Sequence, residues 1–591
     1  MNFDASPLNI RSILSVKQRY IIPRNQREFS WEKLQLDEFW QDIIRNISFD
    51  DTTQLNFSEY FIGTIVLSGV DSDEVLEIVD GQQRLSVITM LLSIISRLLR
   101  KAGQEGIAED IFTTYIVTIS DAIDRNSLGE DGETYVEKIQ KNSGRDYFKL
   151  KFQDRIDHSS KPACDEDRKL SYAGSFLQRK LQRKSLCSLI LQKEGKYNKT
   201  DHIYCLRALY RMITSYLKLV RISVDKGDDA YDIFEVLNAR GINLTSLDLI
   251  KNKIFQNCTQ TFPVDVARRK WDYIVKKIES RSESITITEY VRCWWLSKYN
   301  YIGEEQLYRA FKREMLDDNS SLTATDFLEQ LYKDVDLYVK IISPEQGDWP
   351  QADQREIFDA LNSLSIFNIS IPRPYILSLL RKKRDKPKTL RQSDLIDCLK
   401  RVENFHFKFS AVCRQRPSGL DAKYSVFAVN VSNADNKREL AIRTKETNEY
   451  FQSKTPSDEL FKSSFVNDIY YINSKTSQRK LIIYIFEKIE MHLKGTRELK
   501  FDIVSLEHIG SQKNFLESNS GSMGNLLPLC FSINEDCKDN SLLLKLPEYK
   551  KSNLSIVSEF IKRIESTDDN WTKEKVDARS LALAQLMLES M

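Results

Sequence analysis

The segment VLEIVDGQQRLS (Val75–Ser86) contains a strand, a turn and the start of a helix in direct succession. Its first half is apolar and rich in β-branched residues, which favours a buried strand that ends at Asp80. Gly81 then permits a tight turn and a close approach of backbone. The apolar run Leu85–Leu99 follows and predicts a long, buried helix. We therefore predict an α/β domain here, with Asp80 and Gly81 where the strand meets the helix.

The turn after Asp80 has the features of a phosphate-binding site. The free N–H groups and the dipole of a helix that begins at Gln82 favour a negative charge. Arg84 lies in the first turn, where its planar guanidinium can bind phosphate oxygens in pairs. Asp80 can hold a Mg²⁺ that bridges those oxygens or orient a water, and Gln82 and Gln83 can hydrogen-bond a base, a ribose or a water. The simpler alternative is an aspartate that caps the helix beside an exposed arginine.

Two other segments add polar groups that can join this site. The first, IPRNQREFSW (residues 22–31), contains Trp31, which we expect in the core. The second, NARGINLTSLDLIK (residues 238–251), places polar residues at the end of a helix. The candidate binding residues of the two segments are Gln26, Arg27, Asn238, Arg240 and Gly241. The sequence contains no GxxxxGKS or GxxxxGKT motif, so it does not predict a Walker-type ATPase.

A second informative stretch is FDIVSLEHIGSQKNFLESNSGSMGNLLPLCFSINEDCKDN (residues 501–540). His508 follows an apolar, strand-like segment, and a loop rich in Ser, Gly and Asn separates it from Asn525. A metal-assisted nuclease needs a neutral histidine to take a proton from water, a hard divalent cation, and oxygen or nitrogen ligands for it. The spacing is similar to that of an HNH motif, in which the first His is the base, a middle Asn fixes the loop, and a last His or Asn ligates the metal.

On this comparison His508 is the general base, Asn525 fixes the loop, and Asn534 at the start of the following helix ligates the metal. Glu507 is a further candidate metal ligand. The alternative for an isolated histidine is a satisfied core residue, but the three accompanying polar residues argue against it. A zinc-stapled variant would need CxxC pairs, which this stretch lacks.

At these places the sequence resembles the GmrSD-type, modification-dependent restriction endonucleases. The N-terminal part resembles a domain related to the ParB/sulfiredoxin fold, in which the DGQQR turn hydrolyses a nucleotide. This resemblance rests on Ile22-Pro23, Gln26-Arg27, Trp31, Phe61-Ile62-Gly63, Asp80 through Ser86, Phe234, Asn238, Arg240-Gly241, Leu244, Asp248 and Lys251. The C-terminal part resembles the HNH domain of the same family, through Glu507-His508-Ile509, Gly524-Asn525-Leu526, Asn534 and the tail Tyr549-Lys550-Lys551-Ser552. Ser511 stands where the family has a proline.

The resemblance implies a set of ligands and roles. It implies nucleoside triphosphate binding by Gln26, Arg27, Gly81, Gln82, Gln83, Arg84, Asn238 and Arg240, with Asp80 and Arg84 as the hydrolytic residues. The sequence does not decide between GTP, CTP, UTP and ATP. The expected metal is Mg²⁺ or Mn²⁺, and the expected substrate is double-stranded DNA, modified DNA included. Whether the chain forms a homo-oligomer or works with another defence protein stays open.

The bulk composition limits the number of domains and the kind of DNA contact. A chain of 591 residues predicts two or three domains, at roughly 100–200 residues per domain. Hydrophobic residues make up 41% and charged residues 29%, which is typical of a globular protein. The formal net charge is only +2, so any DNA-binding surface must be a local patch. The basic run Arg381–Arg391 is either such a patch or a solvated loop between helices.

Several features indicate a protein of the cytoplasm. The 9 cysteines include no CxxC pair, which indicates free thiols in a reducing compartment. The N-terminus shows no basic, apolar leader. The longest apolar stretch, Leu85–Leu99, is shorter than the ~20 residues that a membrane span needs. We therefore expect neither export nor a membrane partner.

From these observations we predict an α+β, predominantly helical protein with three parts. Residues 1–255 form a ParB-like domain that binds and hydrolyses a nucleotide, residues 256–435 a helical middle region, and residues 436–591 an HNH nuclease domain with a ββα-metal motif. The predicted function is NTP-regulated cleavage or nicking of foreign DNA in defence against phage. Two alternatives stay open: a ParB-like, nucleotide-switched DNA-binding protein with an inactive nuclease, and a toxin-like nuclease controlled by a partner.

Overall fold

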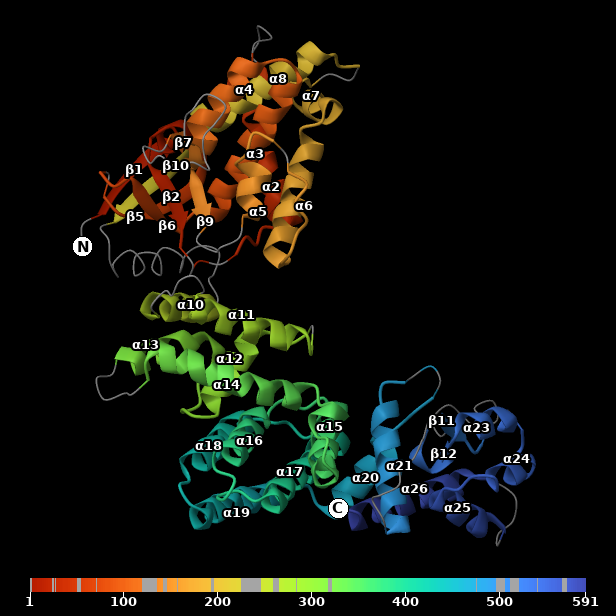
Figure 1. Ribbon diagram of the computed structural model, residues 1–591. Helices are drawn as coiled ribbons and strands as arrows, with labels where there is room; N and C mark the ends of the chain where they lie inside the picture. The colour runs from red at the N-terminus through yellow and green to blue at the C-terminus, as the bar shows by residue number, and fades with distance from the viewer. Residues whose placement is uncertain are drawn as a thin grey trace. The chain divides into compact units, whose positions relative to one another are not determined.

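The computed structural model forms two compact units, Met1–Thr259 and Gln260–Met591 (Figure 1). The residues it describes are 3–23, 26, 28–49, 55–70, 72–119, 135–141, 146–156, 158–192, 196–224, 246–258, 265–282, 284–316, 322–472, 474, 476–495, 505–510, 520–538, 540–565 and 571–591. Within these ranges, the helices are all too short or too polar to cross a membrane.

The first unit is built on a mixed β-sheet, whose six described strands follow the order β1-β10-β5-β6-β2-β9. These strands are β1 (Phe3–Asn9), β2 (Arg19–Ile22), β5 (Tyr60–Ser68), β6 (Val75–Asp80), β9 (Ile139–Lys141) and β10 (Leu217–Val224). Strand β10 is parallel to β5, and β2 is parallel to β6 and β9, whereas β1–β10 and β5–β6 are antiparallel. The register sets Asp80, the last residue of β6, opposite Val66 of β5.

Several helices of this unit pack against α3 (Gln82–Lys101), which begins directly after the turn at Gly81 (Figure 1). Helix α3 contacts α4, α5, α6 and α8, and every residue from Leu85 to Ile95 is buried. The predicted strand, turn and buried helix are therefore confirmed. The other described elements are α1 (Ile10–Leu14), α2 (Lys33–Arg45), β3 (Ile47–Phe49), β4 (Leu55–Phe57), α4 (Glu105–Ile111), η1 (Phe112–Ile116), β7 (Val117–Ile119), β8 (Tyr135–Glu137), α5 (Tyr147–Phe152), α6 (Asp165–Lys180), α7 (Arg183–Leu191), α8 (Lys199–Arg211), η2 (Met212–Tyr216) and α10 (Ser246–Asn257).

Both faces of the sheet are buried beside the turn. Ile65 and Ile78 belong to the large core that includes α3. Val66 and Val79, the next residues along the same strands, belong to a separate apolar cluster. Successive strand residues point to opposite faces, so a shift of one residue would exchange the two sets. The position of Asp80 at the end of β6 is therefore fixed by packing on both faces of the sheet.

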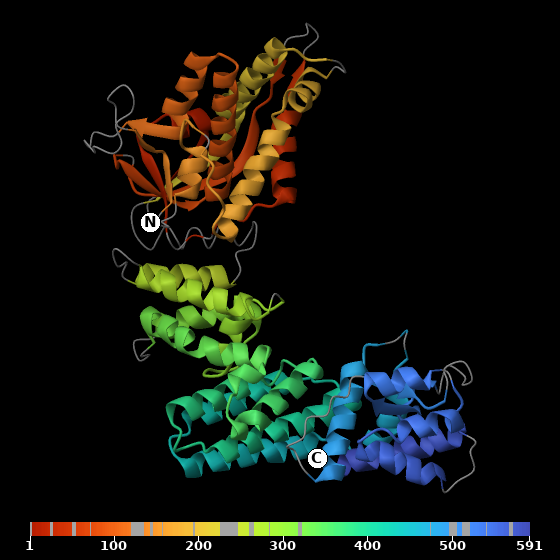
Figure 2. The ribbon, with the colours of Figure 1, turned by 45° about the vertical axis from the view of Figure 1, so that its right-hand side comes forward.

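The second unit is helical apart from two short strands among its described residues, β11 (Ser505–His508) and β12 (Leu526–Leu529). Figure 1 labels both strands among the C-terminal helices drawn in blue, and Figure 2 shows these helices from a second side. Its helices are α11 (Val266–Glu279), α12 (Ile287–Leu296), α13 (Leu307–Leu316), α14 (Ala324–Ile342), α15 (Arg355–Ile366), α16 (Arg373–Asp385), α17 (Gln392–His406), α18 (Leu420–Asn433), α19 (Lys437–Lys454), α20 (Asp458–Asp468), α21 (Arg479–Lys494), α23 (Phe531–Cys537), α24 (Leu542–Tyr549), α25 (Ser555–Glu565) and α26 (Lys573–Glu589). The predicted class, α+β and predominantly helical, is confirmed. The predicted middle region (residues 256–435) and nuclease domain (residues 436–591) lie together in this unit, apart from the first few residues of the former.

Part of the basic run Arg381–Arg391 is buried in an ion-pair network. Arg381 donates from Nε to Asp334 at 2.7 Å, and Arg384 donates from Nη2 to the same carboxylate at 2.8 Å. Lys382 donates to two backbone carbonyl groups at the end of α18, each at 2.8 Å. These three residues belong to α16 and join it to α14 and α18, so this part of the run is not a solvated loop.

Candidate functional site

The turn at Gly81 brings the start of α3 against strand β5. Gly81 has a φ of +92°, a left-handed conformation that side chains rarely adopt. A Cβ atom at Gly81 would lie 3.2 Å from the carbonyl oxygen of Thr64 and 3.3 Å from Ile65 Cα. Gly81 is also the N-cap of α3, and it offers no side chain to cap the helix. The first N–H groups of α3 therefore suit an acceptor from outside the helix, such as a phosphate.

Arg84 is held against strand β5 by backbone contacts. Its Nη1 donates to the carbonyl oxygen of Thr64 at 2.8 Å. Gly63 makes room for the guanidinium, since a Cβ atom there would lie 3.1 Å from Arg84 Cζ and the φ of Gly63 is +111°. The half-buried guanidinium thus has a fixed position close to the N-terminus of α3.

The glutamines near the turn bind the chain's own backbone. Gln83 donates from Nε2 to the carbonyl oxygen of Glu28 at 3.1 Å and accepts at Oε1 from the N–H of Ser30 at 3.0 Å. Gln26 donates from Nε2 to the carbonyl oxygen of Val79 at 2.9 Å. These two side chains therefore hold the segment before α2 against the end of β6 and the start of α3.

A residue that the sequence did not single out completes this arrangement. Glu166 of α6 accepts at Oε1 from the N–H of Phe29 at 2.9 Å and forms a buried ion pair with Lys141 at the end of β9. The two segments are 137 residues apart in the chain, so no local pattern indicates the contact.

The structure brings part of the predicted nucleotide site together. Gln82 and Gln83 are each 7% exposed, while Asp80 and Arg84 are partly buried. These four residues lie next to Gly81 in the chain. Gln26 follows β2, the neighbour of β6 in the sheet, and its side chain donates to the backbone of β6 close to the turn. Arg27, Asn238, Arg240 and Gly241 lie outside the described residues.

In the second unit, strands β11 (Ser505–His508) and β12 (Leu526–Leu529) form an antiparallel hairpin, followed by α23. His508 ends β11 opposite Leu526, Asn525 lies directly before β12, and Asn534 lies in the middle of α23. This is a strand–strand–helix arrangement in which His508 and Asn525 flank the loop between the strands, whereas Asn534 lies within the helix and not, as the sequence predicts, at its start. Ser511 lies outside the described residues.

His508 is buried and hydrogen-bonded to backbone. Its side chain packs parallel to the ring of Tyr471, with 5.8 Å between ring centroids, and its Nε2 lies 3.1 Å from the Tyr471 carbonyl oxygen. Because a carbonyl oxygen only accepts, Nε2 carries the proton and the lone pair stays on Nδ1. Burial lowers the pKa of His508 below 6.5, and the nearby Lys545 ammonium acts in the same direction. The imidazole is therefore neutral near pH 7.

Glu507 is buried in a network with two residues of α24. Lys545 Nζ lies 2.6 Å from Glu507 Oε1, and the Tyr549 hydroxyl donates to the same oxygen at 3.2 Å. Lys545 also donates to the carbonyl oxygen of His508 at 2.8 Å. The side chains of Glu507 and Lys545 are only 7% and 2% exposed. The sequence did not single out Lys545, although this lysine reaches the hairpin. Its spacing of four residues from Tyr549 on one helix is the signal that could have identified it.

Asn525 fixes the connection between the two strands. Its side-chain amide donates to the carbonyl oxygens of Gly510 at 3.0 Å and Ser520 at 2.7 Å. Its Oδ1 accepts from the N–H of Gly510 at 2.8 Å and from Trp571 Nε1 at 2.9 Å. Asn525 is fully buried. The ends of the loop that follows His508 are therefore tied to a single side chain.

The C-terminal helix α26 supports the same turn. Arg579 donates from Nη1 to the carbonyl oxygens of Gly524 and Leu526, both at 2.7 Å. The N–H of Gly524 donates to Ser580 Oγ at 2.8 Å, and a Cβ atom on Gly524 would overlap the carbonyl oxygen of Val576. Gly524 is thus required for the close approach of helix and turn.

The expected metal ligands of the hairpin have partners within the protein. The described residues contain no group of three or more His, Cys, Asp and Glu residues that could hold a metal ion. The amide nitrogen of Asn534 donates to the hydroxyl of Ser505, and Glu507 Oε1 is taken up by Lys545 and Tyr549. Ser505 and Glu507 lie on one face of β11 and His508 on the other, because strand residues alternate. A divalent cation at Glu507 does not fit beside the Lys545 ammonium.

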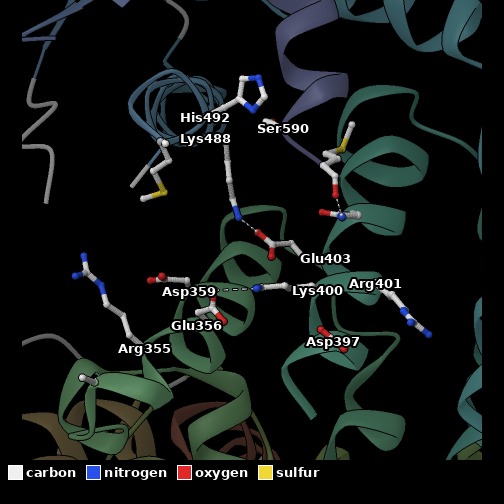
Figure 3. A pocket seen from close by; sticks show the side chains of 15 residues that line it. Arg355, Glu356, Asp359, Asp397, Lys400, Arg401, Glu403, Lys488, His492 and Ser590 are labelled. Atoms are coloured by element: carbon white, nitrogen blue, oxygen red, sulfur yellow. Dashed lines mark hydrogen bonds and ion pairs between the residues drawn. The ribbon is translucent and has the colours of Figure 1, made fainter. Parts of the chain in front are cut away.

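A charged cleft of about 950 Å³ lies elsewhere in the second unit, between α15, α17, α21 and the last residues of the chain (Figure 3). Figure 3 shows Lys488 directed at Glu403, with an ion pair of 2.8 Å, and Lys400 bonded to Glu356 at 2.8 Å. Burial raises the pKa of Asp359, and burial together with Asp359 raises the pKa of the neighbouring Glu487 to about 6. The predicted site residues are not among those that line the cleft.

Comparison with known proteins assigns the two candidate sites to domains of one protein family. Residues 10–255 match the N-terminal domain of the GmrSD restriction endonucleases, and residues 455–586 match their C-terminal domain. The chain belongs to the GmrSD restriction endonuclease family. A search of curated proteins found no match.

The two GmrSD matches contain the two candidate sites. The first includes the turn at Gly81, and the second includes the hairpin, α23, α24 and most of α26. As a GmrSD restriction endonuclease the chain is a restriction-type nuclease, whose substrate is DNA. Most of the residues that line the charged cleft lie between the two matches.

Proposed function

We propose that this GmrSD chain cuts or nicks DNA at an HNH site with His508 as the general base, under the control of a nucleoside triphosphate that binds near Arg84. The observation that carries the nuclease assignment is the state of His508. It is buried, neutral, and fixed through Nε2 to a backbone carbonyl. A neutral imidazole with its lone pair on Nδ1 is the form that a general base requires. Such cleavage would act in defence against phage and other foreign DNA, modified DNA included.

In this proposal His508 takes a proton from the water that attacks a phosphodiester of the DNA. The Tyr471 carbonyl then stabilises the protonated ring through the Nε2–H bond, in keeping with its raising effect on the pKa of His508. Asn525 keeps the residues after His508 in place. When bound, Mg²⁺ or Mn²⁺ supplies charge stabilisation to the phosphate. Asn534 stays a proposed metal ligand, whereas the Glu507 carboxylate is held by Lys545.

The proposed nucleotide site lies at the start of α3. It is supported by the absence of a side-chain cap at Gly81, by the fixed guanidinium of Arg84, and by the space that Gly63 leaves for it. In this proposal Arg84 binds phosphate oxygens and Asp80 takes part in hydrolysis. Gln26 and Gln83 contribute by holding the neighbouring segment in place, since their amides are bonded to backbone.

The test is cleavage of plain and modified plasmid DNA by the full chain, with Mg²⁺ or Mn²⁺ and with or without each nucleoside triphosphate. We expect His508→Ala to reduce cleavage by about 10²–10⁴-fold, because a general base typically contributes that much. His492→Ala is the matched control, since His492 lies on α21 with a partly exposed side chain. Wild-type rates in His508→Ala would refute the assignment. DNA binding by wild type without any cleavage would instead favour the inactive-nuclease alternative, and cutting of host DNA on expression the toxin alternative.

A further inference from the structure

The Glu507–Lys545 pair has the environment of a permanent internal ion pair. Both side chains are almost fully buried, and the ammonium has two oxygen acceptors, Glu507 Oε1 at 2.6 Å and the carbonyl of His508 at 2.8 Å. Tyr549 adds a third polar group to the same carboxylate oxygen. Charges that are buried and paired in this way are costly to separate, because the charge that is left behind is not solvated by water. Lys545 is thus a resident cation beside Glu507.

A resident ammonium and a divalent cation compete for the same carboxylate. Mg²⁺ binds carboxylate oxygens at about 2.0–2.1 Å, closer than the hydrogen bond that Lys545 makes. Two cations on one buried oxygen would repel strongly, since Coulomb energies rise as the dielectric constant falls. The metal could bind only if the ammonium left, and Lys545 is anchored at the same time to the backbone of His508.

We infer that Lys545 keeps divalent cations away from Glu507, so that Glu507 is not a metal ligand. The two residues instead position His508. The pair connects β11 to α24 next to the base: Lys545 binds the carbonyl group of His508 itself, and Glu507 is its neighbour in the strand. This inference rests on the proposed role of His508 and goes beyond it by replacing an expected metal ligand with an intramolecular cation.

The experiment measures Mn²⁺ binding to the full chain by titration calorimetry in the absence of DNA and nucleotide. Four proteins are compared with wild type: Glu507→Gln, Lys545→Met, the double variant, and Lys551→Met. Lys551 is the matched control, because it pairs with Glu548 on the surface and does not reach the hairpin. Thermal unfolding of each variant shows which ones fold.

We expect Glu507→Gln to bind Mn²⁺ as wild type does. Lys545→Met should bind at least about 10-fold more tightly, because the substitution removes a positive charge next to the carboxylate. The double variant should lose that gain, and Lys551→Met should show none. If wild type binds no Mn²⁺, the appearance of a Glu507-dependent site in Lys545→Met is the supporting result.

Two results would overturn the inference. One is a loss of Mn²⁺ affinity of about 10-fold or more in Glu507→Gln, which would make Glu507 a ligand. The other is a folded Lys545→Met protein that gains no Glu507-dependent site. If Lys545→Met does not fold, the comparison of Glu507→Gln with wild type decides alone: equal Mn²⁺ binding by the two proteins supports the inference, and a loss of affinity of about 10-fold or more in Glu507→Gln refutes it. Plasmid cleavage by wild type is measured in parallel, so that failure of the nuclease proposal is seen separately from failure of this one.

Discussion

Replacement of Asn525 by alanine should destabilise the C-terminal unit more than any single change on its surface. The variant loses four hydrogen bonds, two accepted by Oδ1 and two donated by Nδ2. The N–H of Gly510 and the indole N–H of Trp571 are left without their acceptor, at about 1–3 kcal/mol for each buried donor. The two lost carbonyl partners add about 0.5–1.5 kcal/mol each.

The sum is about 3–9 kcal/mol, a large part of the ~5–15 kcal/mol that stabilises a typical domain. The measurement is urea unfolding of the full chain, followed by tryptophan fluorescence. Because the chain has two compact units, the transition of the second unit is the one to compare. Asn467→Ala is the matched control, since this exposed asparagine of α20 bonds only within its own helix. An Asn525→Ala midpoint equal to that of Asn467→Ala would refute the reasoning.

Three further predictions concern charge. Arg84→Ala should weaken binding of a nucleoside triphosphate at least about tenfold, because one charged hydrogen bond contributes about 1.5–3 kcal/mol; titration with each triphosphate measures this, and the control is cleavage by the nuclease unit, which should persist. Asp334→Ala should lower the free energy of unfolding by about 3–5 kcal/mol, since it leaves Arg381 and Arg384 without their shared partner. Thermal unfolding measures this, and the control is Asp336→Ala, because the carboxylate of wild-type Asp336 is about half exposed. Glu487→Gln should stabilise the protein at pH 7.5 by at most about 2 kcal/mol and change nothing at pH 4, because the folded-state pKa is raised from 4.5 to about 6.

The sign for Glu487 follows from which form the fold prefers. Burial favours the protonated carboxyl, so its contribution to stability is complete below pH 4.5 and is lost as pH rises through about 6. Glutamine has no such loss. If the difference in the free energy of unfolding between Glu487→Gln and wild type stays constant from pH 4 to pH 8, this account is wrong. For Arg84, unchanged affinity for every triphosphate would place the nucleotide elsewhere, and for Asp334 a wild-type melting temperature would show that the buried arginines find other partners.

Local sequence patterns predicted the parts of the fold that local forces determine. The strand Val75–Asp80, the turn at Gly81 and the hairpin around Asn525 depend on neighbouring residues, on apolar periodicity and on glycine geometry. Local patterns could not predict residues whose partners are distant in the sequence. Lys545 reaches Glu507 from α24, and although its spacing from Tyr549 places both residues on one face of that helix, the packing of this face against β11 comes from the tertiary fold.

The basic run around Arg381 illustrates the same limit. Its charge alone was compatible with solvent or with DNA, because the sequence does not show that Asp334 of another helix lies against it. The glutamines of the N-terminal turn are similar: their polarity was recognised, but their backbone partners in the segment before α2 come from the tertiary fold. Sequence therefore located both candidate sites but not the contacts that set their electrostatics.

The contacts of α26 also link two regions of the second unit. The helix runs from Lys573 to Glu589, about 25 Å at ~1.5 Å per residue. In its first half, Ser580 Oγ accepts a hydrogen bond from the N–H of Gly524. Just beyond its other end, the carbonyl oxygen of Met591 accepts a hydrogen bond from Asn404 of α17 at 3.0 Å. Helix α26 thus spans the distance between the turn that carries Asn525 and the C-terminal residues that contact α17. A change at the border of the charged cleft and a change at the turn that carries Asn525 therefore act near opposite ends of the same helix.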